Sequence, residues 1–187
     1  ITHIWIAAHS GYLKRNNHSV ELFDATFYNN WKHNEKNFEK EFLKTDYDEL
    51  VQYKNSSVFE DLQKKINKFN PDLIFWSAIS SHIHSEGEYV NIQNGYDLLK
   101  NLNIPDKTKL ITGGLQATSA PKFIFDKMKK INFLIRGESE LTLNLIATHI
   151  DEKKSFKNLH GLAYKEKDQL IINKPQKILK DLNLLFP

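Results

Sequence analysis

Hydrophobic residues along this chain alternate between short continuous runs and helical spacings. Short, mainly apolar segments are typical of strands covered on both faces of a sheet, and they occur at residues 73–76, 109–112 and 132–135. Apolar positions three or four residues apart predict helices at residues 2–15, 57–69, 90–102, 120–130 and 140–150. A strand over residues 2–7 is the alternative at the start. The alternation predicts an α/β fold with a parallel sheet and helices on both faces.

Two regions depart from this alternation. Residues 20–25 alternate between apolar and polar side chains, which predicts a further strand, and the polar, aromatic-rich stretch that follows could hold a helix over residues 35–43. Near the end, residues 161–164 and 169–172 flank a short polar loop and predict a β-hairpin. We therefore expect an α/β domain over residues 1–155.

The remaining residues, 156–187, are expected to form the hairpin and an extended linker. Before the hairpin, Ser139 is placed to cap the helix over residues 140–150. The expected core face of that helix consists of Leu141, Leu145, Ile146 and Ile150.

Composition narrows the classes of partner and compartment. The 187 residues are 40% hydrophobic, and 26 Lys and Arg against 23 Asp and Glu give a net charge of only +3. That balance does not indicate nucleic acid or a membrane surface as a partner. No apolar run approaches the ~20 residues of a membrane span, so we expect a cytoplasmic protein. The chain begins at Ile1 without Met or a signal peptide, and we expect it to come from a longer protein.

The absence of cysteine excludes a disulfide scaffold and any cysteine-bound zinc or iron–sulfur site in this chain. His82 and His84 lie two residues apart and would share a face of an extended segment, but no further ligand cluster lies near them in the sequence, so we expect no metal site. The aromatic residues Phe27, Tyr28, Trp31 and Tyr53 are expected to pack in a core, and the alternative is a cluster that faces a ligand. No nucleophile elbow, phosphate loop or carboxylate pair is present.

Chemically distinctive residues follow the three expected parallel strands, at the edge where ligands bind in open parallel sheets. These segments are residues 77–81, 113–118 and 136–140. Adjacent Gly113 and Gly114 lack Cβ atoms, so a flat ligand can approach the backbone closely, and serine hydroxyls can donate or accept hydrogen bonds. The alternative is structural: a tight turn, capping serines and a surface ion pair between Arg136 and Glu138.

With these segments placed, the chain resembles the N-terminal cobalamin-binding domain of B12-dependent radical SAM enzymes. Residues 5–25 resemble that family's first helix and second strand, and residues 70–77 resemble its "PDLIGFS" strand. Residues 111–118 resemble "GGxHAT", with Gln116 in place of histidine. Residues 135–140 resemble "RGEGE", with Ser139 in place of glycine. The "GLAY" hairpin and the "DLDxLPFP" linker correspond to residues 160–164 and 181–187.

The resemblance implies a flavodoxin-like, Rossmann-like three-layer domain that binds cobalamin. In the family, the serine segment and the glycine pair line the slot for the dimethylbenzimidazole tail. Carried over to this sequence, the cofactor-binding residues are Ser77, Ser81, Gly113, Gly114 and Thr118, with Gly137 and Glu138 at the other rim.

The resemblance also implies what lies outside the chain. The family's first strand and its cobalt-ligating Asp-x-His-x-x-Gly motif would precede Ile1, and its Cys-x-x-x-Cys-x-x-Cys motif would follow Pro187. We expect the partners to be a C-terminal radical SAM domain, which would bind S-adenosylmethionine and a [4Fe-4S] cluster, and a small-molecule substrate. The chain alone is expected not to be catalytic.

Two alternatives remain. A scaffold domain of the same fold that has lost cofactor binding would have its pocket filled by bulky side chains such as Trp76 or Leu115. A stand-alone nucleotide-sugar-binding enzyme of doubly wound fold would need a glycine loop that cradles phosphate, which this sequence lacks.

Overall fold

The computed structural model describes residues 4–31, 53–78, 88–178, 180–181 and 183. The contacts divide the chain into two compact units. The first contains residues 1–20, 71–100 and 105–187, and the second contains residues 21–70 and 101–104.

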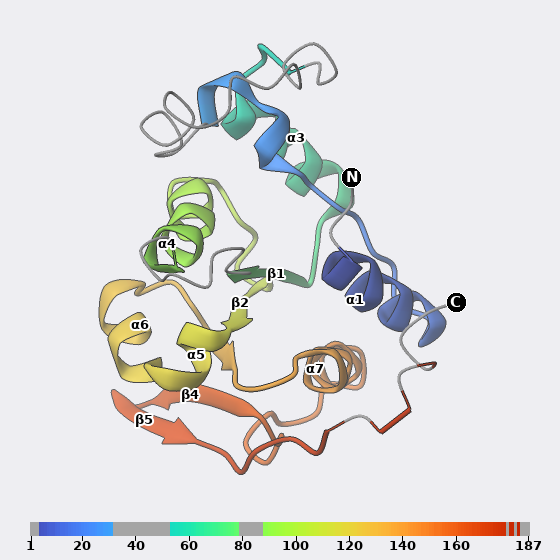
Figure 1. Cartoon of the computed structure of the whole chain (residues 1–187), viewed down its shortest axis with the longest axis vertical. Helices are drawn as coiled ribbons and strands as arrows, with labels where there is room; N and C mark the ends of the chain where they lie inside the picture. Colours follow the sequence, from blue (N-terminus) through green and yellow to red (C-terminus); the bar gives the residue numbers. More distant parts are fainter. Residues whose placement is uncertain (1–3, 32–52, 79–87, 179, 182, 184–187) are drawn as a thin grey trace, which may run out of the picture. The chain divides into compact units, whose positions relative to one another are not determined.

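A single five-stranded sheet, in the order β1-β2-β3-β4-β5, organises the first unit (Figure 1). Strands β1 (Leu73–Ala78), β2 (Lys109–Gly114) and β3 (Phe133–Ile135) are parallel. Strands β4 (Leu162–Glu166) and β5 (Gln169–Ile172) form the predicted hairpin, and β4 pairs antiparallel with β3. The α/β fold is therefore as predicted, and the hairpin extends the main sheet at one edge.

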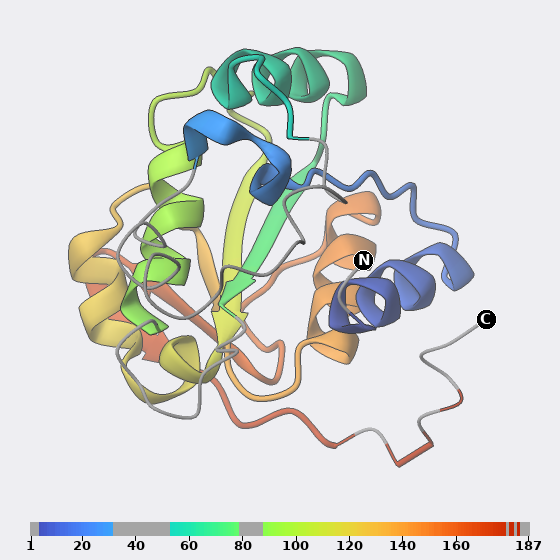
Figure 2. The same cartoon turned by 45° about the horizontal axis from the view of Figure 1, so that its top comes forward.

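Helices cover both faces of this sheet (Figure 2). Helices α1 (Ile4–Arg15) and α7 (Glu140–Asp151) pack on one face, and α4 (Glu88–Leu99) and α6 (Pro121–Lys127) pack on the other. A short helix that the sequence did not indicate, α5 (Leu115–Ser119), directly follows β2. The first unit thus has the expected layers of helix, sheet and helix.

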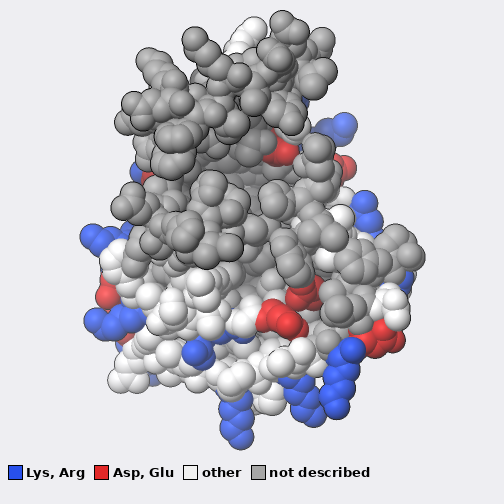
Figure 3. All heavy atoms as spheres, in the orientation of Figure 1, with Lys and Arg blue, Asp and Glu red and all other residues white. Residues whose placement is uncertain are grey.

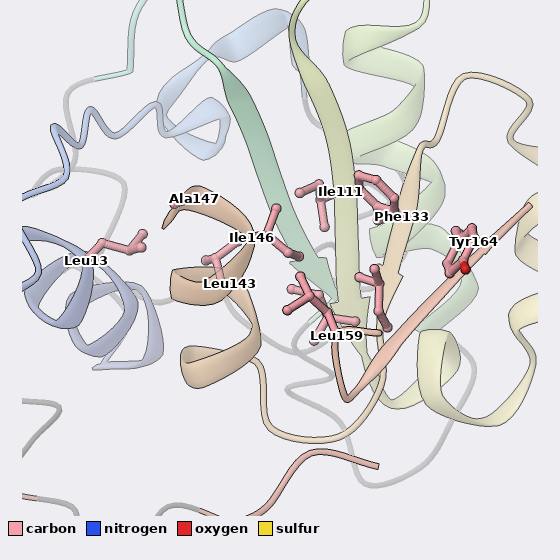
Figure 4. Close-up of a cluster of buried hydrophobic side chains, with 10 residues drawn as sticks. Leu13, Ile111, Phe133, Leu143, Ile146, Ala147, Leu159 and Tyr164 are labelled. Atoms are coloured by element: carbon pink, nitrogen blue, oxygen red, sulfur yellow. The ribbon is translucent and has the colours of Figure 1, made fainter. Parts of the chain in front are cut away.

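The face covered by α1 and α7 holds the larger cluster of buried side chains (Figure 4). Leu13 of α1 and Leu143 and Ile146 of α7 pack toward Ile111 and Phe133 of the sheet. The predicted core face of α7 needs a correction, because its buried residues are Glu140, Thr142, Leu143, Ile146 and Ala147.

Of the face predicted for α7, only Ile146 is fully buried, while Leu145 and Ile150 are half-buried at the border of the cluster. The apolar residues of this helix therefore extend beyond the face that is buried. Thr142 and Ala147, which have short side chains, are buried on this helix as well.

The strand predicted over residues 20–25 does not form. Residues 18–24 have no regular secondary structure, and a 3-10 turn, η1 (Ala25–Phe27), follows them. An alternating pattern indicates a strand only where a neighbouring strand offers a ladder of hydrogen bonds. Among the described residues, no strand pairs with residues 20–25. The helix predicted over residues 35–43 lies outside the described residues.

The hairpin turn explains how β4 and β5 connect without glycine. Lys167 and Asp168 have φ angles of 48° and 64°, so both central residues of the turn are left-handed. This is the backbone that two-residue hairpin loops need, because it matches the twist of the strands. Asp tolerates it better than most residues do.

The second unit is built on α3 (Val58–Phe69), whose Val58, Leu62 and Ile66 are buried. The Ser57 hydroxyl accepts the Glu60 N–H at its start, and Asn70 ends it in the left-handed conformation at φ 51°. This end agrees with the helix stop expected before Pro71.

Tyr28 is 2% exposed in this unit, as expected of a core aromatic residue, and its hydroxyl donates to Asp61 Oδ2 at 3.2 Å. The Ser56 hydroxyl donates to the same oxygen, and this hydrogen bond lowers the pKa of Asp61. The hydroxyl of Tyr28 and the amino groups of Lys64 and Lys54 act in the same direction, against the effect of desolvation.

Among the described residues, none of the helices combines the length and apolar character that a membrane span needs. On the face shown in Figure 3, basic and acidic side chains are interspersed over the described part.

Candidate functional site

The carboxyl ends of the parallel strands bring the predicted serine and glycine segments together. In the β1–β2 register, Ser77 lies opposite Gly113 and Ala78 lies opposite Gly114. Ser77 is exposed, so its hydroxyl is available at this edge, whereas Gly113 is buried. The sequence therefore placed these residues correctly as neighbours.

Gly114 has a backbone conformation that only glycine adopts readily. Its φ and ψ are 103° and −173°, and it directly precedes α5. This region of backbone space is strained for any residue with a Cβ atom. Glycine at position 114 is thus required by the turn itself.

Thr118 of α5 links the end of β2 to the loop that follows β3. Its Oγ1 donates to the Gly114 carbonyl at 3.0 Å and accepts the Gly137 N–H at 2.8 Å. The carbonyl of Thr118 in turn accepts the Arg136 Nε–H at 3.3 Å. These three contacts make Thr118 a positioning residue that holds the Gly137 loop against the end of β2.

The loop after β3 is open at Gly137. A Cβ atom placed there would have no other atom within 4 Å, and the residue has φ 80°. Glu138 next to it is exposed. The Arg136 Nε–H donates to the Thr118 carbonyl, so its guanidinium holds the start of this loop against α5.

A contact between α1 and α7 closes the same edge, and local sequence reasoning missed it. His9 Nε2 lies 2.5 Å from Ser139 Oγ and 4.0 Å from Glu140 Oε1, whose side chain is only 9% exposed. Ser139 stands at the N-cap position of α7 but makes no side-chain cap hydrogen bond, which corrects the capping role expected of it. The partners are 130 residues apart, so no local motif marks them.

Trp76 and Leu115 are the bulky side chains that were expected to fill the pocket of a scaffold domain. Trp76 packs toward α4, where its Nε1–H donates to the Ile92 carbonyl at 3.2 Å. Leu115 is 66% exposed. Neither fills the space beside Gly113, but Phe75 does: its Cε2 would lie 3.3 Å from a Cβ on Gly113.

Two groups of predicted residues are not placed here. Ser81 and the histidines His82 and His84 lie outside the described residues. Within the part of the chain that is described, no group of three or more potential metal-ligating side chains occurs.

The described residues at this edge combine polar and apolar groups. They include the exposed Ser77, the exposed backbone at Gly137 and the exposed apolar side chain of Leu115. Such a mixture can hold a large ligand through van der Waals contact and hydrogen bonds at its periphery.

Comparison with known proteins places the chain beside methyltransferases. It is 26% identical over 125 residues to an uncharacterized methyltransferase of Pyrococcus horikoshii. It is 28% identical over 131 residues to cytidylyl-2-hydroxyethylphosphonate methyltransferase of Streptomyces wedmorensis. The matches cover 67% and 69% of the chain but 26% and 22% of the relatives, so the chain spans about a quarter of their length. No protein-family model matches the chain.

Solved structures with the same fold include two radical S-adenosylmethionine enzymes. The methyltransferase TsrM from Kitasatospora setae, solved with tryptophan and a SAM analog, superposes with a TM-score of 0.63 at 15% identity; the match covers 95% of this chain and 28% of TsrM. The cobalamin-dependent enzyme OxsB, solved with aqua-cobalamin and S-adenosylmethionine, gives 0.58 at 14% identity and covers 95% of this chain and 20% of OxsB. At these identities the likeness establishes the shared fold.

Proposed function

We propose that this chain is the cobalamin-binding module of a B12-dependent radical SAM enzyme that transfers a methyl group. One observation carries the proposal: the β1–β2 register sets Ser77 opposite Gly113, and Thr118 ties that strand end to the Gly137 loop. Three segments that resemble motifs of one family thus meet at the edge where open parallel sheets bind ligands.

The residues at this edge fit the periphery of a corrin. Its side chains end in amides, which can exchange hydrogen bonds with the Ser77 hydroxyl and with the backbone near Gly137, and its flat ring can lie against the exposed Leu115. When bound, cobalamin supplies a cobalt that can carry a methyl group. The residues of this chain bind and orient it and contribute no reacting group of their own.

The relatives support this choice of class. Both sequence relatives have methyltransferase names, and the solved structures of the same fold include OxsB with aqua-cobalamin bound. Because the chain has no cysteine, the [4Fe-4S] cluster would be held outside it. The partners we propose are a C-terminal radical SAM domain, which would also bind S-adenosylmethionine, and a small-molecule substrate.

A specific observation favours one alternative, a scaffold domain of the same fold without a cofactor. The Phe75 ring already occupies the space beside Gly113, where a flat group would have to lie. A scaffold domain would keep this ring in place permanently. Cofactor binding requires the ligand either to avoid the space or to displace the ring.

Cofactor retention distinguishes the two functions. Full-length protein is mixed with hydroxocobalamin and passed through gel filtration, and the corrin absorption bands are recorded in the protein peak. We expect about one corrinoid per protein. No corrinoid in the peak would refute cofactor binding and leave the scaffold function.

A pair of serine variants tests the location. Ser77→Arg extends a long charged side chain over the exposed end of β1, and we expect it to weaken binding by about tenfold or more. Ser155→Arg, on an exposed residue beyond the far end of α7, is the matched control and should bind as the wild type does.

A further inference from the structure

The Phe75 ring bridges the end of β2 and helix α1. From the position of a Cβ on Gly113, the ring atoms Cε2 and Cζ lie at 3.3 and 3.5 Å, and Ile135 Cβ lies at 3.6 Å. On its other side, the centroid of the Phe75 ring lies 5.5 Å from that of the His9 imidazole, with the planes tilted by 32°. The ring therefore fills the space above Gly113 on the face that α1 and α7 cover.

The gap between Gly113 and the Phe75 ring is too shallow for a second ring. A Cβ on Gly113 would already be in close contact with the Phe75 ring, at 3.3 and 3.5 Å. A flat group stacked between them would need about 3.5 Å to the atoms on each of its faces. A second flat ring cannot lie against Gly113 unless Phe75 rotates away.

Moving Phe75 is costly because the ring is part of the packing. It is half-buried and packs against the cluster that includes Leu13 and Ile111. By contrast, Ser77, Leu115 and Gly137 are open at the same edge without any rearrangement. Phe75 thus separates a part of the edge that is accessible from a part that is closed.

We infer that Phe75 determines which corrinoids this site accepts, selecting those that do not place an aromatic base above Gly113. The inference rests on the proposed function and specifies its ligand. Cobinamide, which has the corrin ring but no nucleotide tail, uses only the open part of the edge. Cobalamin must leave its base outside or displace Phe75, so it gains no affinity from the base.

The test compares two corrinoids in titrations of the full-length protein, followed by the corrin absorption bands. For the wild type we expect diaquocobinamide to bind as tightly as aquocobalamin or more tightly. Phe75→Ala opens the space and should strengthen cobalamin binding by about tenfold, while cobinamide binding stays within about twofold. The ratio of the two dissociation constants does not depend on the fraction of protein that is folded.

Two further variants keep the result interpretable. Phe75→Leu retains apolar volume in the core, guards against loss of folding and should shift the ratio in the same direction. Leu73→Ala removes a half-buried side chain from the same face of β1, two residues before Phe75, and should leave the ratio unchanged.

The outcomes separate this inference from the proposed function. Cobalamin binding more than tenfold tighter than cobinamide in the wild type, with the same ratio in both Phe75 variants, would overturn the role of Phe75 and leave the proposed function standing. If the wild type and its variants bind neither corrinoid, the proposed function fails and this inference fails with it.

Discussion

Replacing Thr118 with valine tests whether one hydroxyl holds the Gly137 loop in place at the end of β2. Valine keeps the branched shape of threonine and removes only the hydrogen-bonding group. The variant loses the bond donated to the Gly114 carbonyl at 3.0 Å and the bond accepted from the Gly137 N–H at 2.8 Å. Gly114 and Gly137 both lie at the proposed binding edge, so the relative position of these two segments affects function as well as stability.

The size of the effect follows from the surroundings of the two bonds. A hydrogen bond contributes about 0.5–1.5 kcal/mol net, so two would give about 1–3 kcal/mol. Gly137 is exposed, and water can replace its lost partner. We therefore expect Thr118→Val to lower the free energy of unfolding by about 1–2 kcal/mol, measured as a lower urea midpoint with an unchanged slope.

Amide exchange of Gly137 provides the residue-level measurement. Its N–H should lose protection in Thr118→Val and keep it in Thr118→Ser, which retains the hydroxyl. Unchanged stability and unchanged Gly137 exchange in the valine variant would refute the positioning role of Thr118.

Three further changes probe features on which the fold depends. Gly95→Ala places a Cβ that overlaps the Trp76 indole, so it should destabilise the protein by about 1–3 kcal/mol in urea unfolding; a more stable variant, as helix propensity alone would give, would contradict this packing. Gly114→Ala forces a Cβ into a φ of 103° and should cost about 1–3 kcal/mol, whereas an unchanged urea midpoint would exclude strain there. The hydrogen bond from Lys165 lowers the pKa of Asp126. The pair therefore stabilises the fold at pH values above the ordinary Asp pKa. This stabilisation is lost as the pH falls through the lowered pKa. Lys165→Met should raise that pKa in a carboxyl NMR titration, and an unchanged pKa would show that the ion pair does not form in solution.

The sequence predicted the fold well where the signals are local. The apolar segments before Ser77 and Gly113 marked buried strands, and the helices that alternate with them indicated that the strands run parallel. Asn70 before Pro71 marked the end of α3. The alternation at residues 20–25 misled because a strand also requires a neighbour, and alternation carries no information about one.

The site was predictable only in part, because its geometry depends on contacts that are distant in sequence. Gly113 and Ser77 were identified from their places after strands, and the parallel register did bring them together. Whether Phe75 lies over Gly113 depends on that register and on the approach of α1. His9 meets Ser139 only because α1 packs beside α7, so a residue expected to cap a helix contacts an imidazole instead.

Hydrogen–deuterium exchange of the full-length protein, with and without hydroxocobalamin, tests most directly whether the strand ends bind a corrinoid. We predict that the cofactor increases protection of residues 113–118 and 136–139, while the hairpin turn at Lys167 and Asp168 is unaffected. Bound cobalamin that leaves both segments unchanged and protects residues elsewhere would contradict the site.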